Sequence, residues 1–268
     1  CCLVNGLLNT ESIQQAIDQA AVSRKQVLIP EGTFLSGSLT VKSGTEIVLQ
    51  KGAVLLASAE MGDYTQESFI YGKDLESFSL SGQGTINGNG LSFFDKKWKF
   101  TDRPQPWIHL ENSRNLTVSG ITLENSPSHC LVFTGCDSVT VDGIKIFNDA
   151  RSPNTDGIDI NSTKNVSITN CEIRTGDDAI CIKNKTRGEN KYVTENIFVS
   201  NCILESDDAG LKLGTGSSYM TRNCIFKDVK IENTRYGIAL FMSEGGTFSD
   251  VTFQQIEMTT GGRRDDQY

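Results

Sequence analysis

Asn165-Val-Ser-Ile-Thr-Asn-Cys-Glu-Ile173 is the stretch that decides the fold, because apolar and polar residues alternate on both sides of a short bend. Alternation with a period of two is typical of β-strands rather than helices. Val166, Ile168, Cys171 and Ile173 would then point to one side, and the polar residues to the other. The stretch predicts two short strands that bend at an Asn-Cys pair and bury one apolar face.

This phrase recurs along the chain. Its other copies are Asn115–Leu123, Ser138–Ile146, Asn196–Leu204, Asn223–Ile231 and Asp250–Met258, with a partial copy at Ser77–Gly82. From residue 115 onward, consecutive copies begin 23, 27, 31, 27 and 27 residues apart. A near-constant step of this size indicates stacked units, because one unit cannot bury its apolar face alone.

The stacked units predict an all-β fold, a right-handed parallel β-helix that forms a single domain over residues 1–268. A leucine-rich repeat would need a Leu pattern and a helical half, which these phrases lack. A propeller would need about four strands in each ~40-residue blade, more than these units can supply.

One segment, Thr10–Ala21, has the pattern of a helix. Ile13, Ala16, Ile17 and Ala20 recur at helical spacing, and we expect this amphipathic helix to cap the N-terminal end of the solenoid. Asn9 or Thr10 can serve as its N-cap.

The composition excludes several classes of function. The 268 residues include 25 Lys and Arg against 33 Asp and Glu, a net charge of −8. So acidic a chain is a poor candidate for binding nucleic acid. No apolar run approaches the ~20 residues of a membrane span, so we expect no membrane partner. The first residues lack the pattern of a signal peptide, and we expect that any such peptide has been removed.

The eight cysteines leave two alternatives open, because an even count fits both disulfides and buried free thiols in a chain of this length. Cys171 and Cys202 occupy the same place in successive phrases, so we expect them to stack inside the coil as small apolar residues, with a disulfide as the alternative. The absence of a Cys-x-x-Cys pair and the presence of only two histidines argue against structural zinc.

Three acids stand in the loops around the third full phrase. Asp156 precedes it and the pair Asp177–Asp178 follows it, 21 residues after Asp156 and therefore about one coil further on. Stacking would place all three on one side of neighbouring coils, where mutual repulsion lets one acid keep a proton. A protonated acid beside an ionised one is what glycoside hydrolysis needs. Asp159, between two isoleucines, either lines the groove or is a solvated strand residue, and we favour the second interpretation.

Asn154-Thr-Asp-Gly-Ile-Asp-Ile160 and Gly176-Asp-Asp-Ala-Ile-Cys-Ile-Lys183 resemble the paired Asp motifs of glycoside hydrolase family 28, the polygalacturonase family. Ser81–Gly88 and Asn125-Ser-Pro-Ser-His129 resemble the same family. The resemblance implies that Asp177 is the general acid and that Asp156 and Asp178 hold and activate the water. It also implies an inverting hydrolase of a pectic polysaccharide that uses neither metal nor other cofactor, with catalytic coils at about residues 150–245.

Three positions, in two motifs, depart from the family's pattern. Ala209 stands where the family has the histidine of a Gly-His-Gly turn, and Ala239 and Phe241 stand where an Arg-Ile-Lys motif holds the galacturonate carboxylate. Losing these cations removes charge-assisted hydrogen bonds to an acidic sugar. A rhamnogalacturonan backbone or a substituted pectin becomes the favoured substrate, unless other cations substitute.

The candidate substrate-binding residues are Lys183, Lys212, Asp208 and Arg235, with Arg187 and Arg222 as further possible cations. Two other classes of function stay open. One is a polysaccharide lyase, in which Asp207, Asp208 and Lys212 would serve a calcium-dependent elimination, and the other is a non-catalytic β-helix that binds glycan. A polymeric substrate implies a secreted or periplasmic protein, either a monomer or an oligomer of unknown size.

Overall fold

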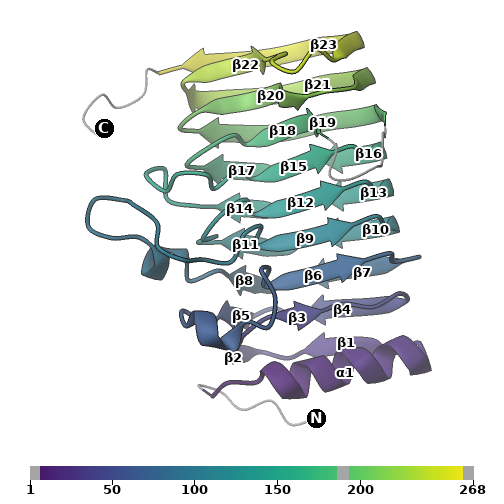
Figure 1. The fold of residues 1–268 in the computed structure, drawn as a ribbon, viewed down its shortest axis with the longest axis vertical. Coiled ribbons are helices and arrows are strands. Elements are labelled where there is room, and N and C mark those ends of the chain that lie inside the picture. The colour runs from purple at the N-terminus through teal and green to yellow at the C-terminus, as the bar shows by residue number, and fades with distance from the viewer. Residues whose placement is uncertain (1–6, 186–192, 262–268) are drawn as a thin grey trace.

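The computed structural model describes residues 7–185 and 193–261 and shows a column of stacked coils with one helix, α1, across its N-terminal end (Figure 1). Each coil contributes strands to three columns, and every strand pair in the assigned ladders is parallel. The prediction of a parallel β-helix is therefore confirmed.

The first column contains the strands that open each phrase, and the second contains those that close it. The first consists of β1 (Gln26–Ile29), β4 (Thr45–Leu49), β7 (Phe78–Gly82), β10 (Arg114–Ser119), β13 (Asp137–Asp142) and β16 (Lys164–Thr169). The second consists of β2 (Gly32–Ser36), β5 (Ala53–Ala57), β8 (Thr85–Asn87), β11 (Thr122–Glu124), β14 (Lys145–Phe147) and β17 (Glu172–Thr175).

The last three coils differ, because one long strand spans both columns: β19 (Thr194–Ser206), β21 (Met220–Thr234) and β23 (Thr247–Thr260). We expected a break at the bend in every phrase. In β19 and β21 the bend is made by Asn201 and Asp228, whose φ angles of 54° and 53° turn the backbone while the flanking residues stay paired with the next coil.

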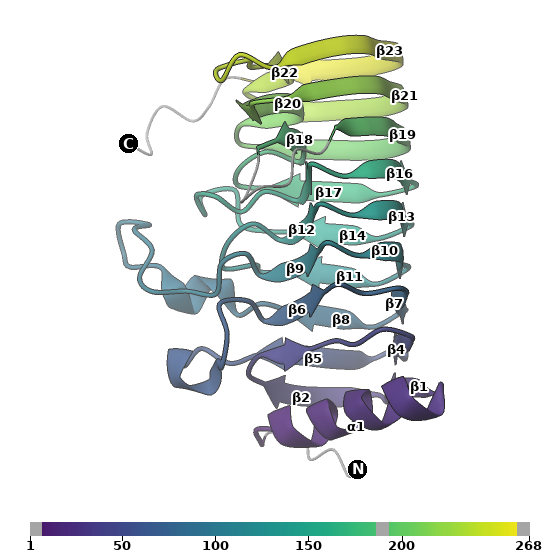
Figure 2. The same cartoon turned by 45° about the vertical axis from the view of Figure 1, so that its right-hand side comes forward.

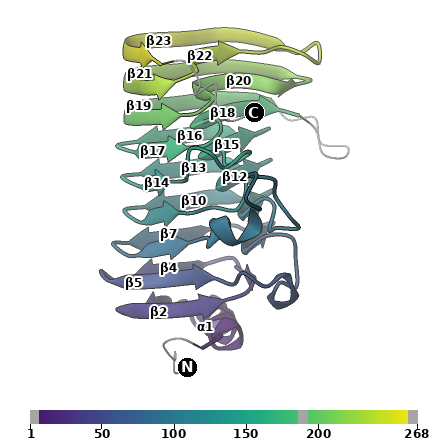
Figure 3. The same cartoon turned by 90° about the vertical axis from the view of Figure 1, so that its left-hand side faces the viewer.

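The third column forms a separate sheet. It consists of β3 (Leu39–Thr40), β6 (Ile70–Lys73), β9 (Ile108–Glu111), β12 (Leu131–Thr134), β15 (Ile158–Asn161), β18 (Ile180–Asn184), β20 (Ala209–Ser217) and β22 (Tyr236–Leu240). Loops from the second column to the third project from one side of the molecule, and two contain short 3-10 helices, η1 (Met61–Asp63) and η2 (Gly90–Phe93) (Figures 2 and 3).

The apolar positions of the phrases line the interior. Val118, Val141, Ile168, Val199 and Phe226 are successive partners in the ladder, and all five are completely buried. Such in-register stacking gives each coil the apolar neighbours that it cannot supply for itself.

The six described cysteines are free and buried. Cys171 and Cys202 stack inside the coil as expected, whereas Cys1 and Cys2 lie outside the described residues. The described part of the chain therefore favours buried thiols over disulfides.

Helix α1 runs from Thr10 to Ser23 and buries Ile13, Ile17 and Ala20 against the first coils, as predicted. Asn9, one of the two residues proposed, is the N-cap, but its side chain makes no capping hydrogen bond, and its backbone N–H donates to Leu35 O at 2.7 Å. The Thr10 hydroxyl instead accepts a hydrogen bond from the Gly37 N–H at 2.7 Å, so the residues at the helix start are used to attach it to the first coil.

An asparagine ladder follows the first residues of successive phrases. Asn223 Nδ2 donates to Asn196 Oδ1 at 2.7 Å, and Asn196 Nδ2 donates to Asn165 Oδ1 at 2.8 Å. All three residues have φ between 53° and 59°, a left-handed conformation that Asn tolerates better than most residues. The ladder and the backbone turn therefore depend on the same side chain.

Replacing Asn196 with Ala is expected to destabilise the protein by about 1–2 kcal/mol, because Ala adopts the left-handed conformation poorly. Asn196→Gly is the matched control, since glycine keeps the backbone turn and removes only the ladder hydrogen bonds. Thermal unfolding of the three proteins measures the effect. An Asn196→Ala variant as stable as the parent would contradict this account.

Candidate active site

The acids singled out in the sequence lie in the loops that lead into the third column. Asp156 precedes β15 by two residues, Asp178 precedes β18 by two, and Asp208 directly precedes β20. Because these strands stack in parallel, the three loops meet on one side of the column. We call Asp156, Asp177, Asp178 and Asp208 the acid cluster.

The carboxylates of the acid cluster lie close together. One oxygen from each of Asp177, Asp178 and Asp208 lies within 4.8 Å of the others, and the same limit joins Asp156, Asp178 and the Cys181 thiol. Asp156 and Asp178 are only 3% and 2% exposed, whereas Asp177 is half-buried. The structure thus brings together the three acids proposed from the sequence, with Asp178 in the centre.

Hydrogen bonds hold Asp177 in a fixed orientation. Its Oδ2 accepts from the backbone N–H of Asn154 at 3.1 Å, and its Oδ1 accepts from the backbone N–H of Asp178 at 2.9 Å. The first of these bonds connects the loop that carries Asp156 with the loop that carries Asp177. A displacement of either loop would therefore change the positions of both Asp156 and Asp177.

Burial and crowding make ionisation of these acids unfavourable. Burial raises the pKa of Asp177, and the negative charge of Asp156 raises it further. Burial, followed by repulsion from Asp156 and Asp177, raises the pKa of Asp178 to about 8. The cluster can therefore retain a proton near neutral pH, which is the property needed for proton transfer to a leaving group.

Lys183 forms ion pairs with two acids of the preceding coil. Its Nζ lies 3.2 Å from Asp156 Oδ2 and 2.9 Å from Asp159 Oδ1. Burial opposes its charge, but the Asp159 and Asp156 carboxylates hold the pKa of Lys183 well above its ordinary value. The expectation that Asp159 is a solvated strand residue is wrong: it is 4% exposed, because Lys183 covers it from the next coil.

Lys212 and Arg235 interact with the other end of the acid cluster. Lys212 Nζ lies 2.7 Å from Asp178 Oδ2 and 3.6 Å from Asp208 Oδ2, and Arg235 Nη1 lies 3.5 Å from Asp208 Oδ1. Of the further cations, Arg222 pairs with Glu195 at 2.7 Å on the first column, away from the acid cluster, and Arg187 lies outside the described residues.

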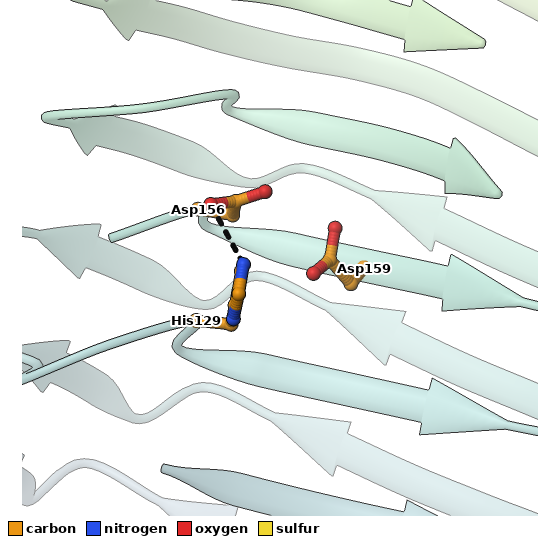
Figure 4. Close-up of side chains that lie close together, drawn as sticks. All are labelled: His129, Asp156 and Asp159. Atoms are coloured by element: carbon orange, nitrogen blue, oxygen red, sulfur yellow. Dashed lines mark ion pairs between the residues drawn. The ribbon is translucent and has the colours of Figure 1, made fainter. Parts of the chain in front are cut away.

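His129 also contacts the acid cluster, a contact that the sequence analysis did not predict. Its Nε2 lies 3.5 Å from Asp156 Oδ1, and Asp159 stands on the adjoining strand (Figure 4). A positional signal could have found it, because His129 precedes β12 by two residues, as Asp156 precedes β15. His129 therefore lies on the coil that precedes the acids in the chain, and not on the coil that follows them.

A cavity of about 330 Å³ opens beside His129, Asp159 and Lys183. Its other lining residues are Pro106, His109, Val132, Thr134, Asn161, Lys185, Thr215 and Gly216. Mixed polar walls of this kind can bind a hydroxyl-rich ligand, and the cavity adjoins the acid cluster through His129 and Lys183, which both contact Asp156.

Arg103, in the loop after η2, is a residue that the sequence analysis missed. Its Nη1 donates to Pro127 O at 2.6 Å and to Pro153 O at 3.2 Å, and its guanidinium lies 3.9 Å from the centre of the Phe100 ring. Burial lowers the pKa of Arg103 to about 10, against the opposing effect of Asp156. Arg103 thus connects the loops that carry His129 and Asp156.

Replacing Arg103 with Met is expected to lower kcat by about 10- to 100-fold, because a displacement of the reacting groups by about 1 Å has an effect of this size. Steady-state kinetics on a substrate that the parent turns over would measure it. Arg103→Lys keeps the charge but cannot reproduce the forked contacts, so it should recover little. An unchanged kcat in Arg103→Met would show that the loop contact has no part in positioning.

The fold and the acid cluster define a parallel β-helix protein that presents closely spaced carboxylates on one side of its third column. A family model described as glycosyl hydrolases family 28 matches residues 20–261. The chain belongs to this family.

Individual relatives agree with this assignment. A probable polygalacturonase of Vitis vinifera is 29% identical over 94% of this chain and 58% of its own length. An endo-polygalacturonase of Pectobacterium parmentieri is 28% identical over 93% of this chain and 69% of its own length. The solved polygalacturonase of Erwinia carotovora ssp. carotovora superposes with a TM-score of 0.83 at 24% identity, covering 95% of this chain and 75% of that one, and so supports the fold. The chain spans less than two thirds of the grapevine relative.

Proposed function

We propose that this chain hydrolyses O-glycosidic bonds of a pectic polysaccharide by general acid–base catalysis. The observation that supports the proposal most strongly is the meeting of Asp156, Asp177 and Asp178, two of them with raised pKa values, in a member of glycosyl hydrolase family 28. Acids held so close are costly to the fold, so a chemical role is the simplest reason for their presence.

In this mechanism Asp177 donates its proton to the leaving oxygen. Asp177 suits this role because none of the described lysines and arginines lies within ion-pair distance of it, so no cation in direct contact favours its charged form as Lys183 and Lys212 do for Asp156 and Asp178. Asp156 and Asp178 each have a lysine partner and serve as the carboxylates that hold and deprotonate the water. Attack by water from the face opposite the leaving group would invert the anomeric carbon.

The proposed substrate-binding residues are Lys183, Lys212, Asp208 and Arg235. They differ in how readily each side chain could contact a sugar. Arg235 is 42% exposed and is the member best placed to meet a sugar. Lys183 and Lys212 would each have to leave a buried ion pair to bind a uronate. These ion pairs, together with Ala239 and Phe241 in place of the cations of the Arg-Ile-Lys motif, favour a rhamnogalacturonan backbone or a substituted pectin over plain polygalacturonate.

A calcium-dependent lyase is less well supported than a hydrolase. Such an enzyme needs carboxylates available to the metal, whereas the Lys212 ammonium already pairs with Asp178 and Asp208. Asp208, one of the acids that the lyase would use, therefore already has a cation partner from the chain itself.

Product analysis on homogalacturonan, rhamnogalacturonan and xylogalacturonan side by side would test the proposal. New reducing ends without the ultraviolet absorbance of an unsaturated uronate are expected, and proton NMR of the first product should show the inverted anomer. Absorbing products would indicate a lyase, and a lack of cleavage with retained binding would indicate a glycan-binding protein.

We also propose that the protein acts outside the cytoplasmic membrane, as secreted or periplasmic, because pectic polymers cannot enter a cell intact. None of the helices in the described ranges is long and apolar enough to cross a membrane. Fractionation of the producing cells would test this, and activity confined to the cytoplasm would count against it.

A further inference from the structure

Lys212 stands on β20 between two small residues of the third column. In the ladder its partners are Cys181 on β18 and Ala239 on β22. Ala239 is one of the positions where the family's carboxylate-binding cation is missing, so this chain carries a cation one coil nearer to the acids. Small neighbours leave the lysine side chain room to lie along the sheet surface.

The Lys212 ammonium is committed to the acid cluster. It forms the 2.7 Å contact with Asp178 Oδ2, and the two side chains are 12% and 3% exposed. Its second partner, Asp208, is held from the other side by Arg235. The Phe241 ring centre lies 5.8 Å from Nζ, within the range of a cation–π contact. Burial lowers the pKa of Lys212 less than Asp178 and Asp208 raise it, so the ammonium stays charged.

The charged and titratable groups around Asp178 come from three coils. They are Asp156 with His129 and Lys183 near it, Asp177 and Cys181 on its own coil, and Lys212 and Asp208 on the coil above. Lys212 is the cation in direct contact with Asp178, and Lys183 pairs with Asp156 and Asp159 instead. Without Lys212, Asp178 would face two acids with no compensating charge at hydrogen-bond distance.

We propose that Lys212 is a positioning residue for catalysis: its ammonium fixes one oxygen of Asp178 and supplies the charge that lets this carboxylate act as a base beside Asp156 and Asp177. The inference rests on the proposed function, in which Asp178 helps to deprotonate the water. In this view Lys212 contacts a catalytic carboxylate and does not bind the substrate.

The pH dependence distinguishes this role from a purely structural one. Burial and repulsion already raise the pKa of Asp178 to about 8 with Lys212 present. Removing a cation in direct contact typically raises a carboxyl pKa by about 1–3 further units. A base that stays protonated is inactive, so the acidic limb of the kcat/KM profile should move to higher pH.

The experiment compares the parent with Lys212→Met, Lys212→Arg and Lys212→Gln, and uses Lys164→Met as a control that removes an exposed lysine of the first column. Aspartate side chains are labelled with carbon-13 and titrated by NMR, with Asp178→Asn to assign the signal. In Lys212→Met we expect the Asp178 midpoint to rise by about 1–3 pH units, and Lys212→Arg to lie near the parent. Lys212→Gln keeps a hydrogen-bond donor without charge, and serves in place of Lys212→Met if that variant does not fold.

Kinetics provide the second measurement. At neutral pH, kcat should fall at least about tenfold for a shift of one unit or more, with little change in KM. An unmoved Asp178 midpoint, or a large rise in KM with kcat preserved, would overturn the inference and make Lys212 a substrate ligand. If the parent cleaves no pectic polymer, the proposed function fails, but the carboxyl titration still tests whether Lys212 controls Asp178.

Discussion

Asp177→Asn is expected to lower kcat by about 10²–10⁴-fold, the usual contribution of a positioned general acid. Asn has nearly the same shape and can keep the hydrogen bonds from the Asn154 and Asp178 backbone N–H groups through its carbonyl oxygen. It cannot release a proton to a leaving oxygen. The loss should therefore appear in kcat with little change in KM, measured on whichever pectic polymer the parent hydrolyses.

The same variant is expected to gain stability at neutral and alkaline pH. The pKa of Asp177 is raised in the folded protein, so its ionisation costs more in the folded chain than in the unfolded one. Above the folded pKa the carboxylate destabilises the fold, and below the unfolded value of ~4 this penalty is absent. Thermal unfolding should thus show a higher Tm for Asp177→Asn at pH 8 and no difference at pH 3.

Asp228→Asn is the matched control, because it removes the same charge at an exposed bend where Asn also accepts the positive φ. It should change neither kcat nor the pH dependence of stability by much. Cleavage by Asp177→Asn at the rate of the parent would show that another group donates the proton.

Lys183→Met is expected to destabilise the protein by about 3–5 kcal/mol, the usual cost of leaving a buried ion pair without one partner. Here two carboxylates, Asp156 and Asp159, lose their shared cation, and both side chains are 5% exposed. The Lys183 side chain is 23% exposed, so solvent access should keep the effect near the lower end of that range. Thermal or denaturant unfolding at pH 7 would measure it.

A second substitution gives this prediction an independent test. Adding Asp159→Asn to the variant removes one of the two unpaired carboxylates and should recover part of the stability. If the double variant is no more stable than Lys183→Met, the ion pair with Asp159 is not what holds Lys183 in place.

The repeats made most of the fold predictable, because alternation in one phrase assigns its strands and the recurrence of the phrase assigns their stacking. Val166 and Ile168 are buried for the same reason that Ile197 and Val199 are, one coil further on. The convergence of Asp156 and Asp178 follows from the same logic, since a spacing of about one coil brings residues together. Their catalytic roles are not visible in the fold and stay predictions.

Contacts between different coils and loops were harder to predict. Asp159 looked solvated because strand alternation places it on the outer face, yet a lysine from the next coil covers it. His129 and Arg103 contact the acid-bearing loops from segments with no repeat of their own, and sequence spacing says little about where such loops fold back. At the start of α1, the side chains of Asn9 and Thr10 contact neighbouring segments instead of capping the helix.

The separation between stacked strands and projecting loops has a consequence for how such a protein can be altered. The loops between residues 58 and 69 and between 88 and 107 vary in length, while the strands that follow them remain in register with their neighbours. An engineer could therefore exchange the loop between residues 58 and 69 to reshape the surface beside the third column, whereas any exchange of the loop between 88 and 107 would have to keep Arg103, which contacts the loops that carry His129 and Asp156. Moving a charge by one coil along the third column offers a second, independent way to change the electrostatics around the acid cluster.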